Sequence, residues 1–251
     1  MSMRVDLNAD LGEGAGHDEE LLHLVSSASI ACGFHAGDPV SILESIRTAR
    51  AHGVAVGAHP SFADRENFGR KEITIPPDEV FAIVSYQLGA FAALSRIAGA
   101  KVNHVKAHGA LYNMAVRDEK LAQAIANAVS AIDSSLLFLA PGKSLFERAA
   151  RAAKLQVVRE VFADRNYLAD GSLVPRTRPD ALLHDPEQAA ERVIRMLREG
   201  IVRSVEGSDV EVQAETICVH GDNPAAVAFV RALRSRLEEG GVIIAAPGTA
   251  L

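Results

Sequence analysis

The sequence predicts an α/β barrel, and two observations carry that prediction. Short apolar segments that suit strands alternate with longer segments of helical spacing, which is typical of a parallel sheet with crossover helices. Three of the predicted strands also have one apolar face and one polar face. A strand in a doubly wound sheet is covered by helices on both sides and is apolar on both faces. The polar faces therefore favour a barrel, with apolar residues outward beneath the helices and polar residues inward.

Each predicted strand is a short apolar run bounded by Gly, Pro or polar residues. The predicted strands cover residues 4–11, 28–34, 54–59, 103–108, 136–141, 155–162 and 215–221. The segments between them have helical spacing, and several begin after a capping residue or a proline. The predicted helices cover residues 40–53, 78–99, 118–132, 142–154, 185–200 and 223–241.

No linker or shift in composition divides the chain. Residues 1–251 are therefore expected to form a single domain, because α/β barrels of this length fold as one unit. The polar residues 163–184 are expected to form a long loop, and long ordered loops in compact domains are often functional.

The composition is that of an ordinary soluble globular protein and excludes several partners. A net charge of −6 leaves no basic excess to hold a phosphate backbone, so no nucleic-acid partner is expected. Residues 1–10 lack a signal-peptide core, and no uninterrupted apolar run reaches the roughly 18 residues of a membrane helix. We therefore expect no membrane partner. Cys32 and Cys218 do not make a disulfide framework, and the expected compartment is the cytoplasm.

Strand parity predicts which side chains point into the barrel, because successive side chains of a strand point to opposite faces. The residues on the polar faces are Asp6, Asn8 and Asp10 of the first strand, His104, Lys106 and His108 of the fourth, and Thr216, Cys218, His220 and Asp222 of the last. Polar groups near the carboxyl ends of barrel strands are typical of an active site. Lys106 and His108 are therefore expected to point into a shared cavity.

Further candidates follow the ends of other strands. Glu13 comes just after the first strand, His35 after the second, and His59 at the end of the third. Asp38 and Asp222 each precede a helix that begins with proline, where an aspartate either caps the helix or marks an N-terminus that holds an anion. Surface carboxylates and a structural histidine are the alternatives for Glu13 and His59.

No recognised metal-binding or phosphate-binding motif is present. On one strand His104 and His108 are roughly 13 Å apart, too far to share an ion whose bonds are about 2 Å long. A metal held by His59, His108 and an aspartate of the first strand remains an alternative, and no metal ligand is assigned. The segment "PGKS" lacks the earlier glycine of a P-loop, because Leu137 occupies that position.

Six segments, in order, are similar to the LamB/YcsF lactam-utilisation family, the family of the 5-oxoprolinase A chain. They are "DLNADLGEG", "ACGFHAGDP", "GAHPSFADRENFGR", "VKAHGALYN", "FADRNYLADGSLVPR" and "CVHGDNPAAV". The resemblance covers nearly the whole chain. Two departures are small: the family usually has Pro where Ala107 stands and often Thr where Asn223 stands. Ala107 falls on the outward face of its strand, so the departure there leaves the catalytic face unchanged.

The resemblance implies a distorted (β/α) barrel of the glycoside hydrolase/deacetylase type, with seven strands. It also implies a cyclic-amide hydrolase that opens 5-oxo-L-proline (pyroglutamate) to L-glutamate with ATP hydrolysis. The family works with partner subunits B and C, so ATP is used by the assembly and the resemblance does not say which chain binds it. A homo-oligomer and a bound metal are both left open.

The chemistry of lactam opening suggests a role for each candidate. A general base must deliver water and a general acid must protonate the nitrogen. We expect Asp10 as the base, helped by Asp6 or His59, His108 as the acid, and Lys106 as the cation that steadies the developing charge. The other expected residues are Arg70, Arg165 and Arg176 for the substrate carboxylate, and Asn8, Glu13, His35 and His220 as groups that bind substrate or hold the site in place.

Two rival functions share this barrel. One is a metal-dependent deacetylase or other amidohydrolase that acts alone on an N-acyl or cyclic amide and needs no ATP. The other is a chain without catalytic activity that only binds substrate or its partner chains. The many inward-facing titratable residues count against the second rival, because a scaffold does not need them.

Overall fold

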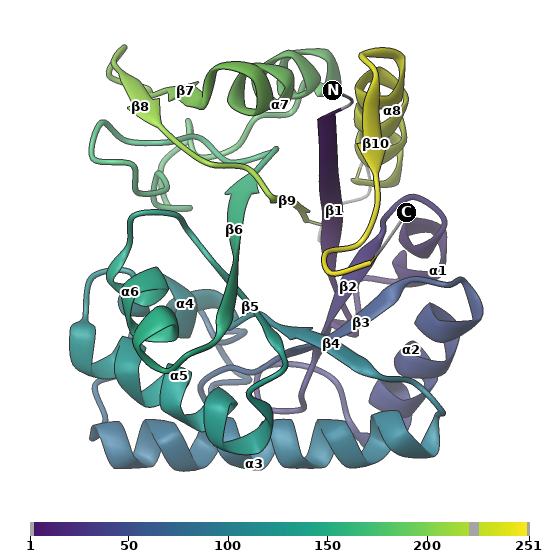
Figure 1. Cartoon of the computed structure of the whole chain (residues 1–251), viewed down its shortest axis with the longest axis vertical. Coiled ribbons are helices and arrows are strands. Elements are labelled where there is room, and N and C mark those ends of the chain that lie inside the picture. The colour runs from purple at the N-terminus through teal and green to yellow at the C-terminus, as the bar shows by residue number, and fades with distance from the viewer. Residues whose placement is uncertain (1–2, 221–225, 250–251) are drawn as a thin grey trace.

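Seven parallel strands close into a barrel (Figure 1). The computed structural model describes residues 3–220 and 226–249. The barrel strands are β1 (Met3–Leu11), β2 (Ser27–Ala31), β3 (Ala55–His59), β4 (Val102–Val105), β5 (Leu137–Ala140), β6 (Gln156–Phe162) and β9 (Thr216–Val219). Strand β1 pairs with β2 on one side and β9 on the other, which closes the ring. The predicted seven-stranded barrel is confirmed.

Helices surround the barrel, as predicted. They are α1 (Asp18–Leu22), α2 (Pro39–Ala51), α3 (Pro77–Ile97), α4 (Gly109–Ala115), α5 (Glu119–Asp133), α6 (Leu145–Ala152), α7 (Pro186–Glu199) and α8 (Ala226–Glu239). The six predicted helices are α2, α3 and α5 to α8, whereas the short α1 and α4 were not predicted. Asp222 and Asn223 lie outside the described residues, as does the predicted start of the last helix.

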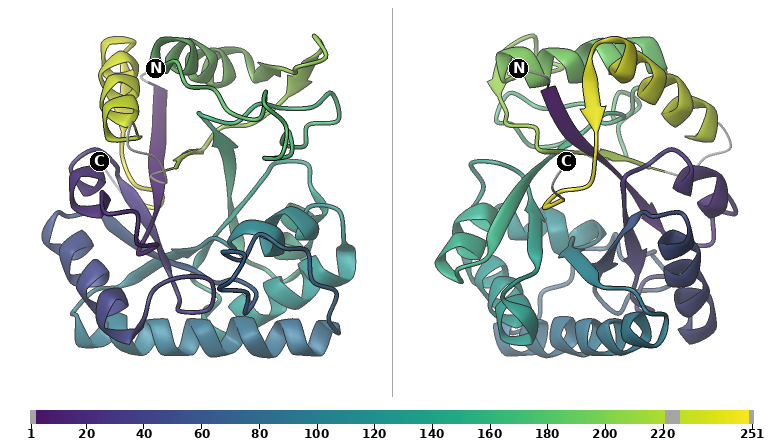
Figure 2. Two further views of the ribbon diagram at one scale, coloured as in Figure 1. Left: turned by 180° about the vertical axis from the view of Figure 1, so that it is seen from behind. Right: turned by 45° about the vertical axis from the view of Figure 1, so that its right-hand side comes forward.

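Three short strands lie outside the barrel ring and were not predicted from the sequence. Strands β7 (Ile201–Arg203) and β8 (Asp209–Glu211) form an antiparallel pair. Strand β10 (Val242–Ile244) pairs with the start of β1, so the first and last strands lie side by side (Figure 2). Residues 163–184 form the expected loop, with only two isolated bridges between strand-like residues.

The inward and outward faces agree with strand parity. Val5, Leu7 and Leu11 of β1 are at most 1% exposed and belong to the apolar core between strands and helices. Ala107 also lies in that core, so the residue that departs from the family pattern faces away from the polar interior. The outward alanine and the inward Lys106 thus follow the alternation expected of an extended chain.

Strand β4 ends earlier than the sequence predicted. Its ladder stops at Val105, although the prediction extended to His108. The chain stays beside β3, because the amides of Lys106 and His108 donate to the carbonyls of Ala58 (3.0 Å) and Pro60 (2.8 Å). Gly109 then begins α4, so the side chains of Lys106 and His108 sit at the carboxyl end of the barrel.

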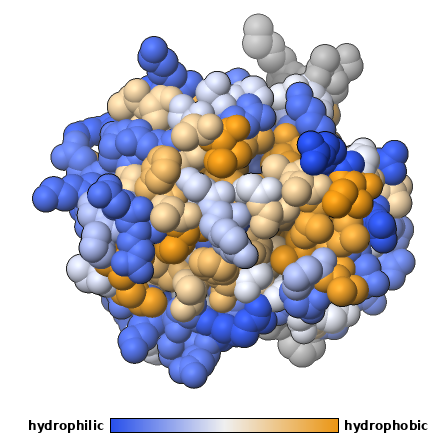
Figure 3. Space-filling model, turned by 90° about the horizontal axis from the view of Figure 1, so that it is seen from below, coloured by the Kyte–Doolittle hydropathy of each residue, from blue (hydrophilic) through white to orange (hydrophobic). Residues whose placement is uncertain are grey.

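Helix α3 is long and apolar enough, by length and composition alone, to span a membrane. A core helix of a soluble protein passes the same test. Val84, Leu88 and Phe91 on its inner face are at most 2% exposed, whereas Tyr86 and Ile97 are exposed. Figure 3 shows the molecule from the side of α3, where apolar side chains gather over the middle of the face and hydrophilic side chains border them. The expected absence of a membrane partner stays a prediction.

Candidate active site

The carboxyl ends of the barrel strands surround a cavity of about 620 Å³, here called the main cavity. This volume is in the range of small-molecule sites, roughly 300–1,000 Å³. The sequence-predicted residues that line it are Asp10, Glu13, His59, Arg70, Lys106, His108, Arg165, Arg176 and His220. The structure therefore brings nine of the predicted site residues together, and the other three lie beneath or beside the cavity.

Lys106 is the centre of a buried ion network at the floor of the main cavity. Its Nζ lies 2.8 Å from Asp10 Oδ1, 3.0 Å from Glu160 Oε1, 3.1 Å from Asn8 Oδ1 and 3.0 Å from Cys218 Sγ. Burial alone would lower the Lys106 pKa, but the Asp10 charge and the other acidic neighbours hold it well above its usual value. The lysine therefore stays charged and is fixed by partners from β1, β6 and β9.

Asp10 carries the complementary negative charge. Burial would raise its pKa, but the charges of His59 and Lys106 outweigh burial and hold the pKa well below its usual value. Its second oxygen, Oδ2, lies 3.4 Å from His59 Nε2. Asp10 is therefore an ionised carboxylate held between two cationic partners.

The sequence reasoning missed Glu160. Its side chain is fully buried, and Oε1 accepts hydrogen bonds from Lys106 Nζ and Asn8 Nδ2. The signal was available, because parity puts Glu160 on the inner face of β6 between Val158 and Phe162. A charged residue within an otherwise apolar strand face needs a partner, and Lys106 supplies it.

Asp6 and Asn8 lie one layer beneath the main cavity. Asp6 is 1% exposed and accepts hydrogen bonds from Ser26 Oγ (2.7 Å), Ser27 Oγ (2.7 Å) and Thr216 Oγ1 (2.5 Å). Asn8 links the layers, since its Nδ2 donates to Thr216 Oγ1 at 2.7 Å while its Oδ1 accepts from the lysine above. Burial raises the Asp6 pKa to about 6. Asp6 does not line the main cavity, so the geometry favours His59 over Asp6 as the helper of Asp10.

Four residues from four different segments meet beside Asp10, and we call them the histidine cluster: Glu13, His35, His59 and His108. Glu13 Oε1 lies 2.9 Å from His35 Nε2, 3.1 Å from His108 Nδ1 and 3.8 Å from His59 Nε2. Burial would raise the Glu13 pKa, but hydrogen bonds from His108 and His35 hold it well below its usual value. For His59, the charge of Asp10 outweighs burial and raises the pKa.

Two glycines let the chain pass closely over this cluster. Gly69 has φ 64°, and a Cβ added there would lie 2.3 Å from Ser61 Oγ and 2.9 Å from His108 Cδ2. Gly109 has φ 56°, and its Cβ would lie 2.5 Å from the carbonyl oxygen of Gly69. Residues other than glycine rarely adopt this backbone conformation, and neither position has room for a Cβ atom. The close approach holds the Phe68 carbonyl against the His108 ring.

His220 follows β9, the strand beside β1, and lines the main cavity close to Asp10, where it is paired with a buried carboxylate. Its Nδ1 is 2.8 Å from Asp164 Oδ2, and its ring stacks on Phe162 with centroids 6.0 Å apart. Burial would raise the Asp164 pKa, but the His220 charge and hydrogen bond hold it below its usual value. The sequence reasoning included His220 and missed Asp164, although Asp164 lies in one of the six family segments.

Arginines line the outer part of the main cavity. Arg165 is 6% exposed and donates from Nη2 to the Val174 carbonyl at 2.7 Å. Burial and the nearby charge of Arg176 lower the Arg165 pKa to about 10. Arg70 stacks on Phe68, with its guanidinium carbon 4.9 Å from the ring centroid. The like charges of Arg165 and Arg176 favour an anionic ligand, because it would relieve their repulsion.

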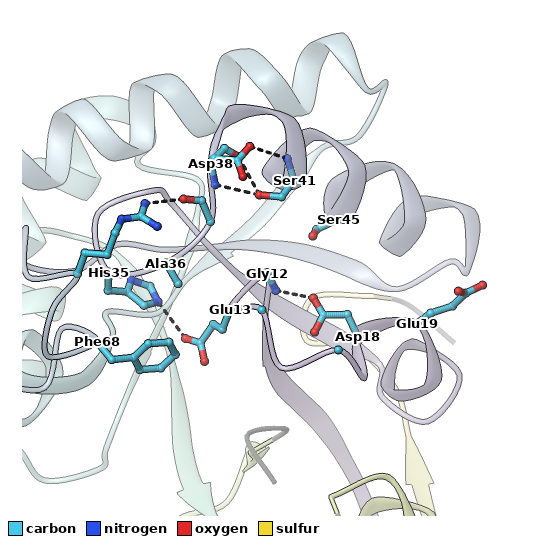
Figure 4. Close-up of a pocket in the computed structure, with 14 residues that line it drawn as sticks. Gly12, Glu13, Asp18, Glu19, His35, Ala36, Asp38, Ser41, Ser45 and Phe68 are labelled. Carbon is cyan, nitrogen blue, oxygen red and sulfur yellow. Dashed lines mark hydrogen bonds and ion pairs between the residues drawn. The ribbon is translucent and has the colours of Figure 1, made fainter. Parts of the chain in front are cut away.

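His35 faces a second cavity, of about 710 Å³, on the other side of Glu13 (Figure 4). Glu13 lines both cavities and separates them. Asp38 lines this second cavity and caps α2, since its Oδ1 accepts from the amides of Val40 (2.9 Å) and Ser41 (3.1 Å). The capping interpretation of Asp38 is therefore confirmed.

Comparison with known proteins identifies the family. The family model described as "LamB/YcsF family" matches residues 5–250. This chain belongs to the LamB/YcsF family. Over 250 residues it is 50% identical to the A chain of 5-oxoprolinase from Symbiobacterium thermophilum, covering 98% of this chain and 96% of that protein. The resemblance inferred from six segments is thus confirmed.

Solved structures place the LamB/YcsF chain in the same fold. The crystal structure of a lactam utilization protein from Thermus thermophilus has a TM-score of 0.91 and 50% identity, covering 97% of this chain and all of that one. A structure called T48 deacetylase with substrate has a TM-score of 0.50 and 15% identity, covering 97% and 87%. The second likeness shows the fold alone and confirms the predicted deacetylase-like barrel.

Proposed function

We propose that this LamB/YcsF chain is the A component of an ATP-dependent 5-oxoprolinase, which opens 5-oxo-L-proline to L-glutamate together with subunits B and C. The observation that carries the proposal is its 50% identity, over 98% of its length, to a protein named as the A chain of 5-oxoprolinase. The main cavity supports it, because it combines an ionised carboxylate, a fixed lysine and arginines in one small-molecule site. The name of that relative implies an assembly of several chains.

The reaction needs an activated carbonyl and a nucleophile. A lactam carbonyl is a poor electrophile, and transfer of the γ-phosphoryl group of ATP to the amide oxygen, with release of ADP, would make it a better one. Attack of water and cleavage of the C–N bond would then give an acyl phosphate, and a second water would release phosphate and glutamate. Asp10 is the proposed general base that delivers water, since its low pKa leaves it ionised and His59 holds it in place. Lys106, 2.8 Å from Asp10, is positioned to stabilise negative charge that develops on the substrate oxygen.

A proton must also reach the ring nitrogen as the amide bond breaks. His108 is the proposed general acid and lines the main cavity beside His59. A second candidate for proton transfer is the His220–Asp164 pair, which also lies at the main cavity. Asp164 would fix the orientation of that imidazole. Its position within hydrogen-bonding distance of His220 makes Asp164 a positioning residue in this scheme.

The substrate carboxylate and the ATP requirement complete the proposal. Arg165 and Arg176, with Arg70 on the facing wall, form the cationic part of the main cavity that would bind the carboxylate. ATP is a substrate of the assembly in this scheme, and no residue of this chain is assigned to it. The proposed compartment is the cytoplasm.

Glutamate release from 5-oxo-L-proline tests the proposal. The purified chain is assayed alone and then with subunits B and C, each with and without ATP. We expect glutamate only from the complete assembly with ATP. Release without ATP by the chain alone, lost on chelation, would instead support the metal-dependent amidohydrolase, and its activity on N-acyl substrates would then be measured.

Two variants locate the chemistry within the assembly. Asp10→Asn and His108→Ala should each lower turnover by roughly 10²–10⁴-fold, the usual contribution of a general base or acid. His52→Ala is the matched control, since His52 lies on the outer end of α2 and does not line the main cavity. Normal turnover by both site variants would move the site elsewhere and leave this chain with a binding role only.

A further inference from the structure

We propose that Glu13, His59 and His108 form a binding site for a divalent transition-metal ion. The site lies in the wall of the main cavity, and its side chains come from the end of β1, the end of β3 and the segment after β4. The inference stands on the geometry of the histidine cluster and does not rest on the lactam reaction.

The backbone determines which ring nitrogens carry hydrogen. His59 Nδ1 lies 2.7 Å from the Lys106 carbonyl, and His108 Nε2 lies 2.8 Å from the Phe68 carbonyl. A carbonyl oxygen only accepts, so each of these nitrogens must carry a hydrogen. The remaining nitrogens, His59 Nε2 and His108 Nδ1, are then the positions where each ring takes up a second proton, and a metal ion would bind there in place of that proton. In a metal-binding histidine, the ring nitrogen that does not bind the metal usually donates its hydrogen to a carbonyl or carboxylate oxygen.

Three lone-pair donors converge on one point. His59 Nε2 and His108 Nδ1 are 3.0 Å apart, and Glu13 Oε1 is 3.1 Å from His108 Nδ1 and 3.8 Å from His59 Nε2. Ligands that share an ion at bonds of 2.0–2.2 Å are separated by roughly 2.9–3.4 Å, depending on the coordination angle. Two of the three separations fall in that range, and the third needs a shift of a few tenths of an ångström.

A proton does not satisfy the same three atoms. With one proton on His59 Nε2, the lone pair of His108 Nδ1 still faces the Glu13 carboxylate at 3.1 Å. With one proton on His108 Nδ1 instead, Glu13 accepts it, but the lone pair of His59 Nε2 then faces Asp10 Oδ2 at 3.4 Å. With a proton on each ring, two N–H groups meet at 3.0 Å and two buried imidazolium cations lie in contact. A divalent cation satisfies all three donors and would lie beside two buried carboxylates, Glu13 and Asp10.

His35 belongs outside the ligand set. Its ring is stacked on His108 at 3.8 Å, with the two planes 6° apart. An ion lies in the plane of the imidazole that binds it, so two parallel rings at this spacing do not reach one ion. His35 Nε2 instead donates to Glu13 Oε1 at 2.9 Å and orients that carboxylate, while its buried Nδ1 has no hydrogen-bond partner among the described residues.

Two imidazoles and one carboxylate suit Zn²⁺, Mn²⁺, Fe²⁺ or Co²⁺, and three protein ligands leave a position open to the main cavity. When bound, such an ion polarises a carbonyl oxygen or a water molecule. With an ion on His59 Nε2, that nitrogen would no longer donate to Asp10 Oδ2, which lies 3.4 Å from it. His108 would be a ligand instead of a proton donor, and the His220–Asp164 pair would be the remaining acid for the proposed reaction.

The test measures metal binding without substrate. The chain is stripped with EDTA, exchanged into metal-free buffer and titrated with Zn²⁺ and Mn²⁺ by calorimetry, and retained metal is counted by mass spectrometry after gel filtration. We expect one equivalent per chain. Glu13→Gln and His108→Ala should weaken binding by at least 100-fold, and His35→Asn by 10–100-fold, as for a group that orients a ligand.

His52→Ala is the matched control. His52 Nε2 and His23 Nε2 are 3.3 Å apart on the surface, so this pair could hold an adventitious ion. Circular dichroism shows whether each variant is folded. The wild-type chain loaded with Co²⁺ gives a readout that needs no variant: two imidazole N–H resonances, held by the Lys106 and Phe68 carbonyls, should shift strongly by paramagnetism.

The outcomes separate clearly. The site is supported if the His52→Ala chain still binds one equivalent of metal, if Glu13→Gln and His108→Ala bind it more weakly, and if Co²⁺ shifts two imidazole N–H resonances. The proposal is overturned if the wild-type chain retains none of the metals tested. It is also overturned if His52→Ala is the only variant that loses the bound metal. If glutamate release does not depend on added metal, that result bears on the proposed reaction and does not change the outcome of the binding test.

Discussion

Lys106→Met should destabilise the protein strongly, because it removes the only cation that the structure shows in contact with both Asp10 and Glu160 among the described residues. Lys106 is 3% exposed and lies 2.8 Å and 3.0 Å from these two carboxylates. Breaking a buried ion pair by removing one partner costs about 3–5 kcal/mol. For a chain of this size that loss lowers the melting temperature by roughly 6–20 °C. Because methionine keeps most of the side-chain volume, the loss of stability is due to removal of the Lys106 charge.

The effect should also depend on pH. In the wild type the Asp10 pKa lies well below its usual value, so its contribution is present above the unfolded pKa and is lost as pH falls through the folded one. Without Lys106 the folded pKa of Asp10 rises. The variant then regains stability relative to wild type as pH falls from about 7.5 toward about 4.5.

Urea unfolding of both proteins at several pH values measures this difference. Lys143→Met is the control, because Lys143 forms an exposed pair with Glu211, and such pairs contribute about 0–1 kcal/mol. A Lys106→Met protein as stable as the control near neutral pH, or a deficit that does not narrow in acid, would refute the argument that Lys106 compensates buried negative charge.

Two further variants probe the layer beneath the site and the loop above it. The folded pKa of Asp6, about 6, exceeds its unfolded value, so wild type should gain about 1 kcal/mol between about pH 7.5 and about pH 5. The Asp6→Asn variant should not show that gain when its unfolding free energy is measured with urea at several pH values. If the unfolding free energy of the variant changes with pH as in the wild type, the raised Asp6 pKa is contradicted. Gly69→Ala should destabilise more than Gly53→Ala, because both have positive φ but only Gly69 also meets a side chain at 2.3 Å. Conformational strain alone costs about 1 kcal/mol, so equal losses would show that the close approach is absent.

The sequence predicted the barrel because the period of two in β1 is a local property. Val5 and Leu7 alternate with Asn8 and Asp10 within one strand, and no distant contact is needed to recognise that pattern. The same local argument failed at the end of β4, because ladder pairing depends on the neighbouring strand. It also missed β10, whose three residues become a strand only by pairing with the first residues of the chain.

It was easier to predict which residues belong to the site than to predict which of them contact one another. Parity showed that Lys106 and Asp10 face inward, but it did not show that Glu160 shares the same lysine. Parity does not say how deep in the barrel each strand places its side chain. Asp6 and Asp10 have the same parity, yet one lies beneath the cavity and the other in its wall.

The histidine cluster shows why chemistry in this protein depends on carbonyl groups that sequence patterns do not reveal. Any reader of the sequence can list His59 and His108, and their separation along the chain excludes a recognised metal motif. The carbonyls of Lys106 and Phe68 decide which nitrogen of each ring faces the other, and Gly69 allows one of those carbonyls to come close. The backbone around the cluster therefore selects which two nitrogens meet at 3.0 Å, and with them the kind of cation that the proposed site would hold.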